Sequence, residues 1–535
     1  MSDRIAWLHV PTIQLFATTL LLAGCFRVAT PIRPDASQEA AAPDSSDDAT
    51  MRNDADAGSA PDADATADTG VELDSAMDSG VDTGADTGVD TGVDTGIEAR
   101  ADVVTDVPIG DVMRLPPVRG LCGDAGACPS GQFCSGGVCT NEYSLHAGGG
   151  FQCLKVREAT TCWGGGDFNA LRPPSTSVWL PTSLAPFASA GSIYGMSSFV
   201  YSTEFIIGAD RSVGYLGYRH VFGDNTTSQP IRPEPVPVAN TSGTLELATG
   251  GPSGVRCAIT MDRNIRCWGC GGAGSLGDGG DRNCEVSETS TRPVAITLPA
   301  PVVQIAIART YAPEWDAFRA ATVCALMQHG VVRCWGVNDV GQRGIGTTDS
   351  VTTTSEAATM GANVVGRYTA IAATESSFCA IADSGAVRCW GYDTVGAMAA
   401  HPSPVAILRG DSTEHGNVEV LRCSGGACCT LERGSRALYC WGSQGLAGSF
   451  GAIVPGGPMT NFIRATRVTP SGLEPGSIED VSIGPPVCAL GRVAGDTTHR
   501  RVVCWGDNER GQAGAPLPSA RLVGFTTVPV VAPGF

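Results

Sequence analysis

Short runs of alternating apolar and polar residues recur from about residue 143 to the end of the chain. In the run 302–308, VVQIAIA, the residues Val303, Ile305 and Ile307 occupy every second position, and Val418 and Val420 do the same at 417–420. Side chains with this spacing point to one face of an extended strand. The pattern therefore predicts a protein built from β-sheets whose strands bury one face.

Each of these runs precedes a predicted hairpin that carries a pair of cysteines. In CAIADSGAVRC, residues 379–389, a short turn containing Gly385 joins two apolar stretches. That turn places Cys379 opposite Cys389 in an antiparallel ladder, and directly opposed Cα atoms lie within disulfide range. The spacing predicts a disulfide that staples the hairpin, worth on the order of 3 kcal/mol in the chain-entropy account.

The hairpin belongs to a repeat marked by Cys-Trp-Gly. The motif begins at Cys162, Cys267, Cys334, Cys389, Cys440 and Cys504. The first interval is about twice the others, which predicts a degenerate copy near residue 215. The segment FIIGADRSVGYLG, 205–217, keeps the spacing, with Phe205 and Tyr215 at the cysteine positions and Leu216 at the Trp position. We expect Phe205 and Tyr215 to face each other as an aromatic cross-strand pair.

Downstream of each hairpin a Gly-rich turn leads into a proline-bearing strand, as in RPVAI at 292–296 and SPVAI at 403–407. Proline cannot donate to a sheet ladder, so this last strand belongs at an edge. Seven units with four strands each predict a seven-bladed all-β propeller over residues 141–535. The tryptophans of the motif are expected to pack between blades: Trp163, Trp268, Trp335, Trp390, Trp441 and Trp505.

These units resemble the repeat of the regulator-of-chromosome-condensation propellers. The likeness is carried by CALMQHGVVRCWGVNDVGQRGIG at 324–346 and FGDNTTSQPIRPEPVPV at 222–238. The WG-N-x-x-G-Q-x-G stretch is complete only after Trp335 and Trp505. The family includes a nuclear nucleotide-exchange factor, chromatin binders and a secreted bacterial β-lactamase inhibitor. Its binding residues do not match positions here, so the resemblance implies the fold and leaves the function open.

Net charge separates the N-terminal part of the chain from the rest. The chain of 535 residues has a formal charge of −19, and 21 acidic residues against five arginines lie between Ala29 and Gly120. That segment has no cysteine and no aromatic residue, so residues 25–120 are predicted to be a disordered acidic stalk. Its tandem Asp-Thr-Gly copies at 82–96 repeat an aspartic-protease tripeptide, but a segment without a core cannot hold two carboxylates together.

The cysteine count indicates an oxidising compartment. The chain has 21 cysteines, and an apolar run from Ile13 to Leu22 precedes Leu22-Ala23-Gly24-Cys25. This stretch resembles a lipoprotein signal, so residues 1–24 are expected to be removed and Cys25 to be lipidated. Soluble secretion is the alternative. An outer-membrane surface location is the expectation, because Phe26 rather than Asp follows the anchor.

The remaining cysteines number twenty, which suits complete pairing. Residues 121–140 form a small disulfide-rich module with Cys122, Cys128, Cys134 and Cys139; zinc binding is the competing interpretation. Two further pairs are Cys270 with Cys284, and Cys423 with Cys428. The hairpin candidates are Cys153, Cys162, Cys257, Cys267, Cys324, Cys334, Cys379, Cys389, Cys429, Cys440, Cys488 and Cys504.

No residue pattern indicates catalysis, a cofactor or a metal. The seven histidines are scattered, and Ser275 in AGSLG and the short Gly344-Ile345-Gly346 lack the flanking elements of a nucleophile elbow or phosphate loop. Without a basic stripe, nucleic-acid binding is not expected. We therefore expect a monomeric, non-catalytic module that binds an extracellular protein or glycan. The alternatives are a secreted-enzyme inhibitor of this fold, and a hydrolase or lyase with a site assembled across blades.

Overall fold

A computed structural model describes residues 122, 128, 132–135, 138–148, 151–157, 159–165, 178–183, 193–199, 202–208, 210–217, 236–250, 254–269, 271–278, 290–309, 321–348, 363–392, 399–442, 462–496, 498–516 and 522–529. The chain divides into two compact units, 1–104 and 105–535, and all described residues belong to the second. The predictions for the signal segment, Cys25, the acidic stalk and the pair Cys270 and Cys284 lie outside the described residues.

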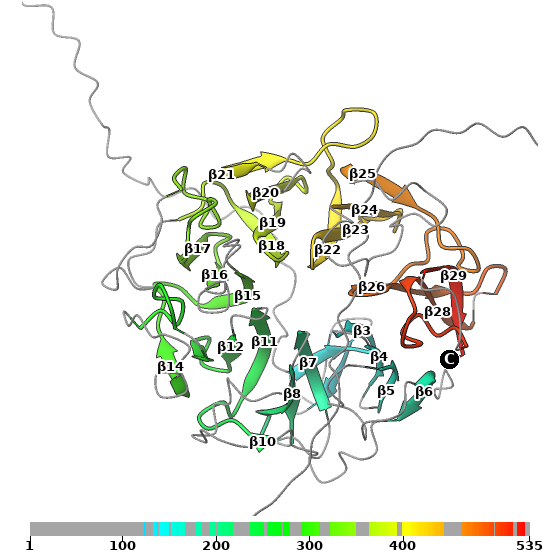
Figure 1. Ribbon diagram of the computed structural model, residues 1–535, viewed down its shortest axis with the longest axis horizontal. Coiled ribbons are helices and arrows are strands. Elements are labelled where there is room, and N and C mark those ends of the chain that lie inside the picture. Colours follow the sequence, from blue (N-terminus) through cyan, green and yellow to red (C-terminus); the bar gives the residue numbers. More distant parts are fainter. Residues whose placement is uncertain are drawn as a thin grey trace, which may run out of the picture. The chain divides into compact units, whose positions relative to one another are not determined.

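The described strands form seven sheets of three or four strands, arranged around a centre (Figure 1), and one separate two-stranded hairpin. The first sheets contain β3 (Tyr143–Ala147), β4 (Phe151–Val156), β5 (Ala159–Gly164) and β6 (Val178–Ser183); β7 (Ile193–Phe199), β8 (Ser202–Ile207), β9 (Ser212–Gly217) and β10 (Val236–Pro237); and β11 (Thr244–Gly250), β12 (Val255–Thr260), β13 (Ile265–Gly269) and β14 (Ser290–Ile296).

The others contain β15 (Val302–Arg309), β16 (Ala321–Met327) and β17 (Val332–Gly336); β18 (Tyr368–Ala373), β19 (Ser377–Ala382), β20 (Val387–Tyr392) and β21 (Ala400–Ala406); β22 (Val418–Ser424), β23 (Ala427–Glu432), β24 (Leu438–Gly442) and β25 (Phe462–Val468); and β26 (Asp480–Ile483), β27 (Val487–Arg492), β28 (Arg500–Asp507) and β29 (Leu522–Val528). The prediction of an all-β propeller is confirmed. Within the described part of the chain there is no helix with the length and apolarity that crossing a membrane requires.

The prediction of seven four-stranded blades needs a correction. The described residues complete six four-stranded blades, not seven, because the β15–β17 sheet has three strands. The proline-bearing run that supplies outer strands such as β14 and β21 has no counterpart between residues 337 and 367, which contain no proline. In its place, Asn363 makes an isolated antiparallel bridge to Arg333 of β17.

Disulfides staple the central hairpin of six sheets. Cys379 lies directly opposite Cys389 in the ladder of β19 and β20, with Cα atoms 4.0 Å apart. The same arrangement joins Cys153 to Cys162, Cys257 to Cys267, Cys324 to Cys334, Cys429 to Cys440 and Cys488 to Cys504. These bonds all lie within one sheet, so they hold hairpins together and do not join neighbouring blades.

The degenerate unit differs from its prediction. Phe205 pairs with Gly214 and Tyr215 pairs with Glu204, so Phe205 and Tyr215 are not opposed. The β8–β9 hairpin is one residue shorter than most others, which shifts the register by one position. Tyr215 therefore takes the place of the tryptophan, not of the second cysteine, and its side chain is buried in a cluster with Val213 and Trp268.

The glycine after each tryptophan allows a bulge between the third and fourth strands. The register between β20 and β21 shifts between Cys389 and Gly391, and Gly391 has a φ of 102°. A Cβ atom on Gly391 would lie 2.6 Å from the carbonyl oxygen of Ser376. L-residues avoid this backbone region, so glycine is required here both for conformation and for space.

The motif tryptophans are buried between neighbouring sheets. All six are at most 2% exposed. The indole nitrogen of Trp390 donates to the carbonyl oxygen of Gln342, at 2.9 Å, in the Gly-rich turn of the preceding sheet. Trp335 bonds Ser275 in the same way, at 3.1 Å. We call this contact the indole latch.

The Gly-rich turn that receives the latch is shaped by its own asparagine. The side-chain oxygen of Asn338 accepts from the backbone N–H of Arg343, and that of Asn508 accepts from Ala513 in the other complete copy of the motif. Gly344 then leaves room for the indole, since a Cβ there would lie 2.8 Å from Trp390.

The last blade contacts the first, which closes the ring. Trp163 of β5 donates to the carbonyl oxygen of Gln512 at 3.0 Å, so the indole latch also operates between the two ends of the propeller. Gln152 of β4, which is fully buried, donates to Pro486 and accepts from Ser482, each at 2.8 Å. The first and last sheets are thereby joined to each other.

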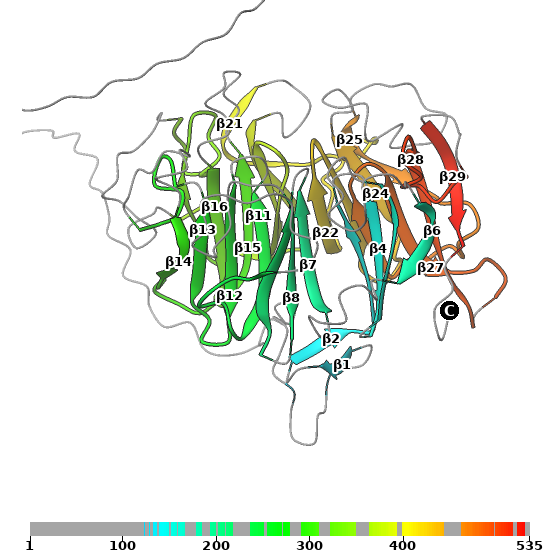
Figure 2. The ribbon, with the colours of Figure 1, turned by 60° about the horizontal axis from the view of Figure 1, so that its bottom comes forward.

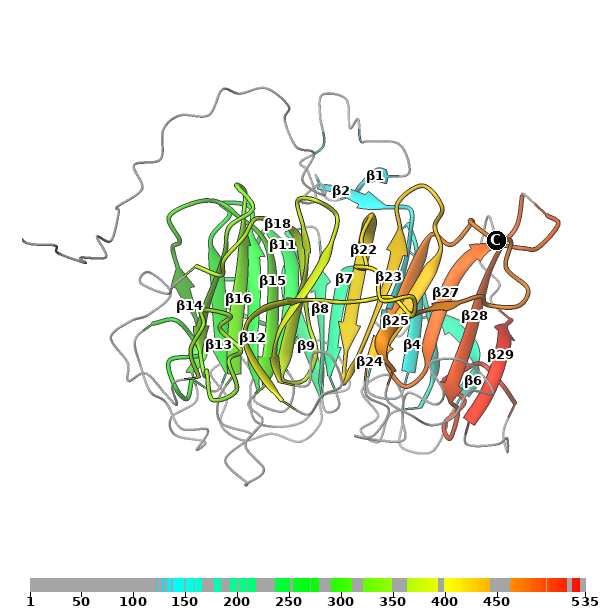
Figure 3. The same cartoon turned by 90° about the horizontal axis from the view of Figure 1, so that it is seen from above.

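The disulfide-rich module docks on one face of the propeller (Figures 2 and 3). Its hairpin consists of β1 (Gln132–Ser135) and β2 (Val138–Asn141), and its cysteines pair as Cys122–Cys134 and Cys128–Cys139. Val138 is fully buried in a hydrophobic cluster shared with Leu245 of β11, and Lys155 of β4 lies 5.5 Å from the ring centre of Phe133. The module is thus packed on the blades.

Candidate functional site: the central channel

A cavity of about 410 Å³ lies between the innermost strands of the sheets. Its described lining residues come mainly from β3, β11, β15, β18, β22 and β26, which together with β7 surround the centre in Figure 1, and Asn141 of β2 also lines it. Residues separated by more than 300 positions in the sequence therefore meet at one site. We call this cavity the central channel.

One register position shows that the channel wall is asymmetric. The residue opposite the first cysteine of the hairpin is Ala248, Ala306 or Ala372 in three consecutive sheets. In the next blades, and after closure of the ring, the same position holds Arg422, Ser482 and His146. The β11–β18 arc is therefore lined by small apolar side chains at this level, and the β22–β3 arc by polar ones.

Carboxylates outnumber cations among the described groups that line the channel. Its acidic lining residues are Glu246, Glu375 and Asp480 and its basic one is Arg422, so their formal charges sum to −2 with His146 neutral. Arg263, which is not a lining residue, also interacts with Glu246. Arg422 pairs with Asp480 at 3.2 Å, and 45% of the Arg422 side chain is exposed. In a concave site with low-dielectric walls, this excess of negative charge attracts cationic groups.

Some of these side chains also hold neighbouring inner strands together. Asp480 accepts from the backbone N–H of Leu145 at 3.0 Å, and Gln304 accepts from Ile371 at 3.0 Å. Glu246 occupies the equivalent position and accepts from Ile305 at 3.4 Å. The three acceptors thus bridge to the next sheet, and Asp480 performs this role where the ring closes.

The titratable groups of the channel are contributed by several blades. Glu246, Glu375, Asp480 and His146 come from four different sheets, and Nε2 of His146 is hydrogen-bonded to Ser144 at 3.0 Å. Among the described residues, the only groups of three potential ligand atoms within 4.8 Å of one another consist of cysteines.

A second cavity, of about 520 Å³, lies between loops of the β22–β25 and β26–β29 blades. Arg436 donates from Nε to Ile478 and from Nη2 to Glu479, both backbone carbonyls, and Glu474 accepts from the backbone N–H of Gly495. These polar groups bind the loops to each other. We therefore place the candidate site in the central channel.

The residues that the sequence singled out lie elsewhere. The hydroxyl of Ser275 is buried and donates to the carbonyl of Ala321 at 2.8 Å, and Gly344 packs on an indole. The cysteines of the 121–140 module form disulfides, so zinc is not needed to hold them. Sequence reasoning missed Arg422 and Asp480, which lie on the inner strands β22 and β26, and Glu375, which lies in the turn after the inner strand β18.

No protein-family model and no curated protein matches the sequence. Solved structures do resemble the fold. Human WBSCR16 superposes with a TM-score of 0.51 and 17% identity, over 67% of this chain and 87% of that one. Yeast RCC1 (Prp20), solved bound to Kap60, superposes with a TM-score of 0.52 and 15% identity, over 72% of this chain and 84% of that one. At these identities the likeness shows the fold alone: the chain is an all-β propeller similar to RCC1.

Proposed function

We propose that this protein is a non-catalytic binding module whose central channel receives a basic side chain of a protein partner. The observation that carries the proposal is the excess of carboxylates over cations among the described residues that line the channel. Complementary charge across an interface speeds association and selects partners. The propeller of similar fold solved bound to Kap60 supports a protein as the partner class.

The two alternative functions find less support. An inhibitor of secreted enzymes would be favoured by aromatic side chains at the channel, and no Phe, Tyr or Trp is among its described lining residues. A hydrolase or lyase would need acid and base groups close together, and among the described residues no carboxylate or histidine belongs to a group of three potential ligand atoms within 4.8 Å of one another. A protein ligand therefore remains the better interpretation, with a glycan as the alternative partner.

We further propose that the protein works outside the cytoplasm. Nine disulfides among the described residues are typical of an oxidising compartment. Lipidation of Cys25, the acidic stalk of residues 25–120 and display on the outer membrane complete the proposal, which rests on the sequence. Metabolic labelling with a fatty acid tests the anchor, since Cys25→Ser should abolish incorporation.

The binding proposal is tested by capture from a cell-envelope extract with the full-length protein as bait. We expect a protein that is enriched on the wild type and lost on a Glu246→Gln, Glu375→Gln bait, with capture weakened by salt. Asp383→Asn is the matched control, because Asp383 is exposed on the β19–β20 turn, outside the channel. Equal capture by wild type and the double variant would refute the channel as the site, and a captured glycan would correct the partner class.

A further inference from the structure

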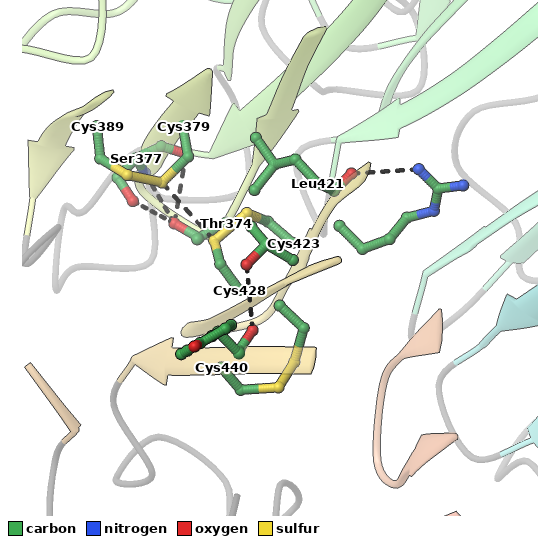
Figure 4. Close-up of a disulfide and its surroundings, with 12 residues drawn as sticks. Thr374, Ser377, Cys379, Cys389, Leu421, Cys423, Cys428 and Cys440 are labelled. Atoms are coloured by element: carbon green, nitrogen blue, oxygen red, sulfur yellow. Dashed lines mark hydrogen bonds between the residues drawn. A yellow bond between two sulfur atoms is a disulfide. The ribbon is translucent and has the colours of Figure 1, made fainter. Parts of the chain in front are cut away.

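Two disulfides from neighbouring blades are in contact beside the central channel (Figure 4). Cys379–Cys389 staples β19 to β20, and Cys423–Cys428 closes the tip of the β22–β23 hairpin. The Sγ atom of Cys428 lies 3.7 Å from the Sγ atom of Cys379. The Sγ atoms of Cys379, Cys423 and Cys428 all lie within 4.8 Å of one another.

The direction of the strand explains why only one of two consecutive cysteines makes this contact. Cys428 and Cys429 are neighbours in β23, and successive side chains of a strand point to opposite faces. Cys428 packs in the cluster that contains Cys379 and Cys389. Cys429 packs in a different cluster, with residues of the β26–β29 blade. A thiolate at Cys428 would therefore face the sulfur of Cys379.

Cys423 is the most exposed of the four cysteines in these two disulfides. It is half-buried and lines the central channel. The other described cysteines of the blades are at most 7% exposed. A small thiol that enters the channel can thus reach Cys423 before it reaches any hairpin staple, because access controls which sulfur is attacked.

We propose that Cys423, Cys428, Cys379 and Cys389 form a thiol–disulfide exchange site for a low-molecular-weight thiol. In the first step, the external thiolate attacks Sγ of Cys423, a mixed disulfide forms, and the Cys423–Cys428 bond breaks with release of the Cys428 thiolate. In the second, this thiolate attacks Sγ of Cys379, the Cys379–Cys428 bond forms, and the Cys379–Cys389 bond breaks.

The electrons and protons of this sequence balance without an oxidant. Each step exchanges one disulfide for another, and the proton lost by the incoming thiol is regained by the thiolate of Cys389. The second step requires the two sulfurs to approach by about 1.7 Å, from contact to the bond length of a disulfide near 2.05 Å. The product links β19 to β23 covalently, so an intrablade staple becomes a bond between blades.

The test uses the full-length protein and reduced glutathione under native conditions. Samples are quenched in acid at intervals, free thiols are alkylated, and the disulfides are identified by non-reducing peptide mass spectrometry. We expect glutathione on Cys423, a Cys379–Cys428 linkage and alkylated Cys389. Cys324–Cys334 is the matched internal control, because it is a fully buried staple, and we expect it to open at least about tenfold more slowly.

A Cys423→Ser, Cys428→Ser variant separates the exchange from simple opening of the staple. This variant keeps every hairpin staple, and in it Cys379–Cys389 should become as slow as Cys324–Cys334. The proposal is overturned if Cys379–Cys389 opens equally fast without the tip disulfide. It is also overturned if the wild type yields free Cys428 with Cys379–Cys389 intact, or if glutathione adds to no channel cysteine while other disulfides open.

Discussion

Replacement of His415 by glutamine should change how the stability of the propeller depends on pH. His415, in the β21–β22 loop, is fully buried against the β22–β25 blade, with its ring centre 5.0 Å from that of Tyr439. Nε of Arg409 donates to Nδ1 at 3.1 Å, so Nδ1 carries no proton, and Nε2 is 2.7 Å from the hydroxyl of Thr430. The imidazole is thus held in its neutral form.

Three groups determine the acidity of this imidazole. Burial lowers the pKa of His415 the most, the nearby Arg409 guanidinium lowers it further, and Glu432 opposes them; together they bring the pKa from 6.5 to about 4. The unfolded chain therefore takes up the proton first as the pH falls. The contribution of His415 to stability is complete above pH 6.5 and is lost as the pH falls toward 4.

The shift from 6.5 to about 4 corresponds to on the order of 3 kcal/mol in the free energy of unfolding. Urea unfolding at a series of pH values measures it. The difference in stability between wild type and His415→Gln should be constant above neutral pH and shrink by that amount as the pH approaches 4. His329→Gln, at an exposed turn position, is the control. Parallel pH profiles for wild type and His415→Gln would refute this reasoning.

Three further substitutions test the contacts that shape and join the blades, each read by urea unfolding. Gly391→Ala should cost about 2–4 kcal/mol, because its φ is positive and the new Cβ meets a carbonyl oxygen, whereas Gly410→Ala, with open space around it, should change stability by less than about 0.5 kcal/mol. Trp335→Phe keeps most of the ring but loses the indole latch, so a loss of about 1–3 kcal/mol is expected; an unchanged midpoint would contradict a role for the latch. Asp480→Asn removes the ion pair with Arg422 and should cost about 1 kcal/mol at low salt, with the difference reduced in high salt.

The features that the sequence predicted are local ones. A hairpin with cysteines at its two ends needs only the spacing between Cys379 and Cys389, and the edge position of the outer strands follows from proline chemistry. The register of the degenerate unit was not predictable in this way, because one residue fewer in the β8–β9 turn moved Tyr215 from the cysteine position to that of the tryptophan. The total length of the motif does not show which part of it, the turn or a strand, is one residue shorter.

The residues that line the channel could not be predicted from the sequence. Their positions depend on the number of residues between each inner strand and the hairpin that follows it. Ala248 faces a cysteine nine positions later, Cys257, while Ala306 faces one eighteen positions later, Cys324. These offsets come from connections of different length, so no fixed step along the chain selects the lining residues. The contact between Cys428 and Cys379 was hidden for a related reason, because it joins two repeats and not two ends of one hairpin.

Disulfides stabilise the individual sheets of this propeller, whereas tryptophans help to connect neighbouring sheets. Every hairpin staple acts within one sheet, so the cysteines cannot by themselves close a ring. Closure depends on noncovalent contacts between the first and last blades, where Trp163, Gln152 and Asp480 make hydrogen bonds across more than 300 residues of sequence. Bringing such distant segments together costs more chain entropy than joining adjacent blades. The buried hydrogen bonds of Gln152 and the charge-assisted bond of Asp480 offset that cost at the one interface where no short connection helps.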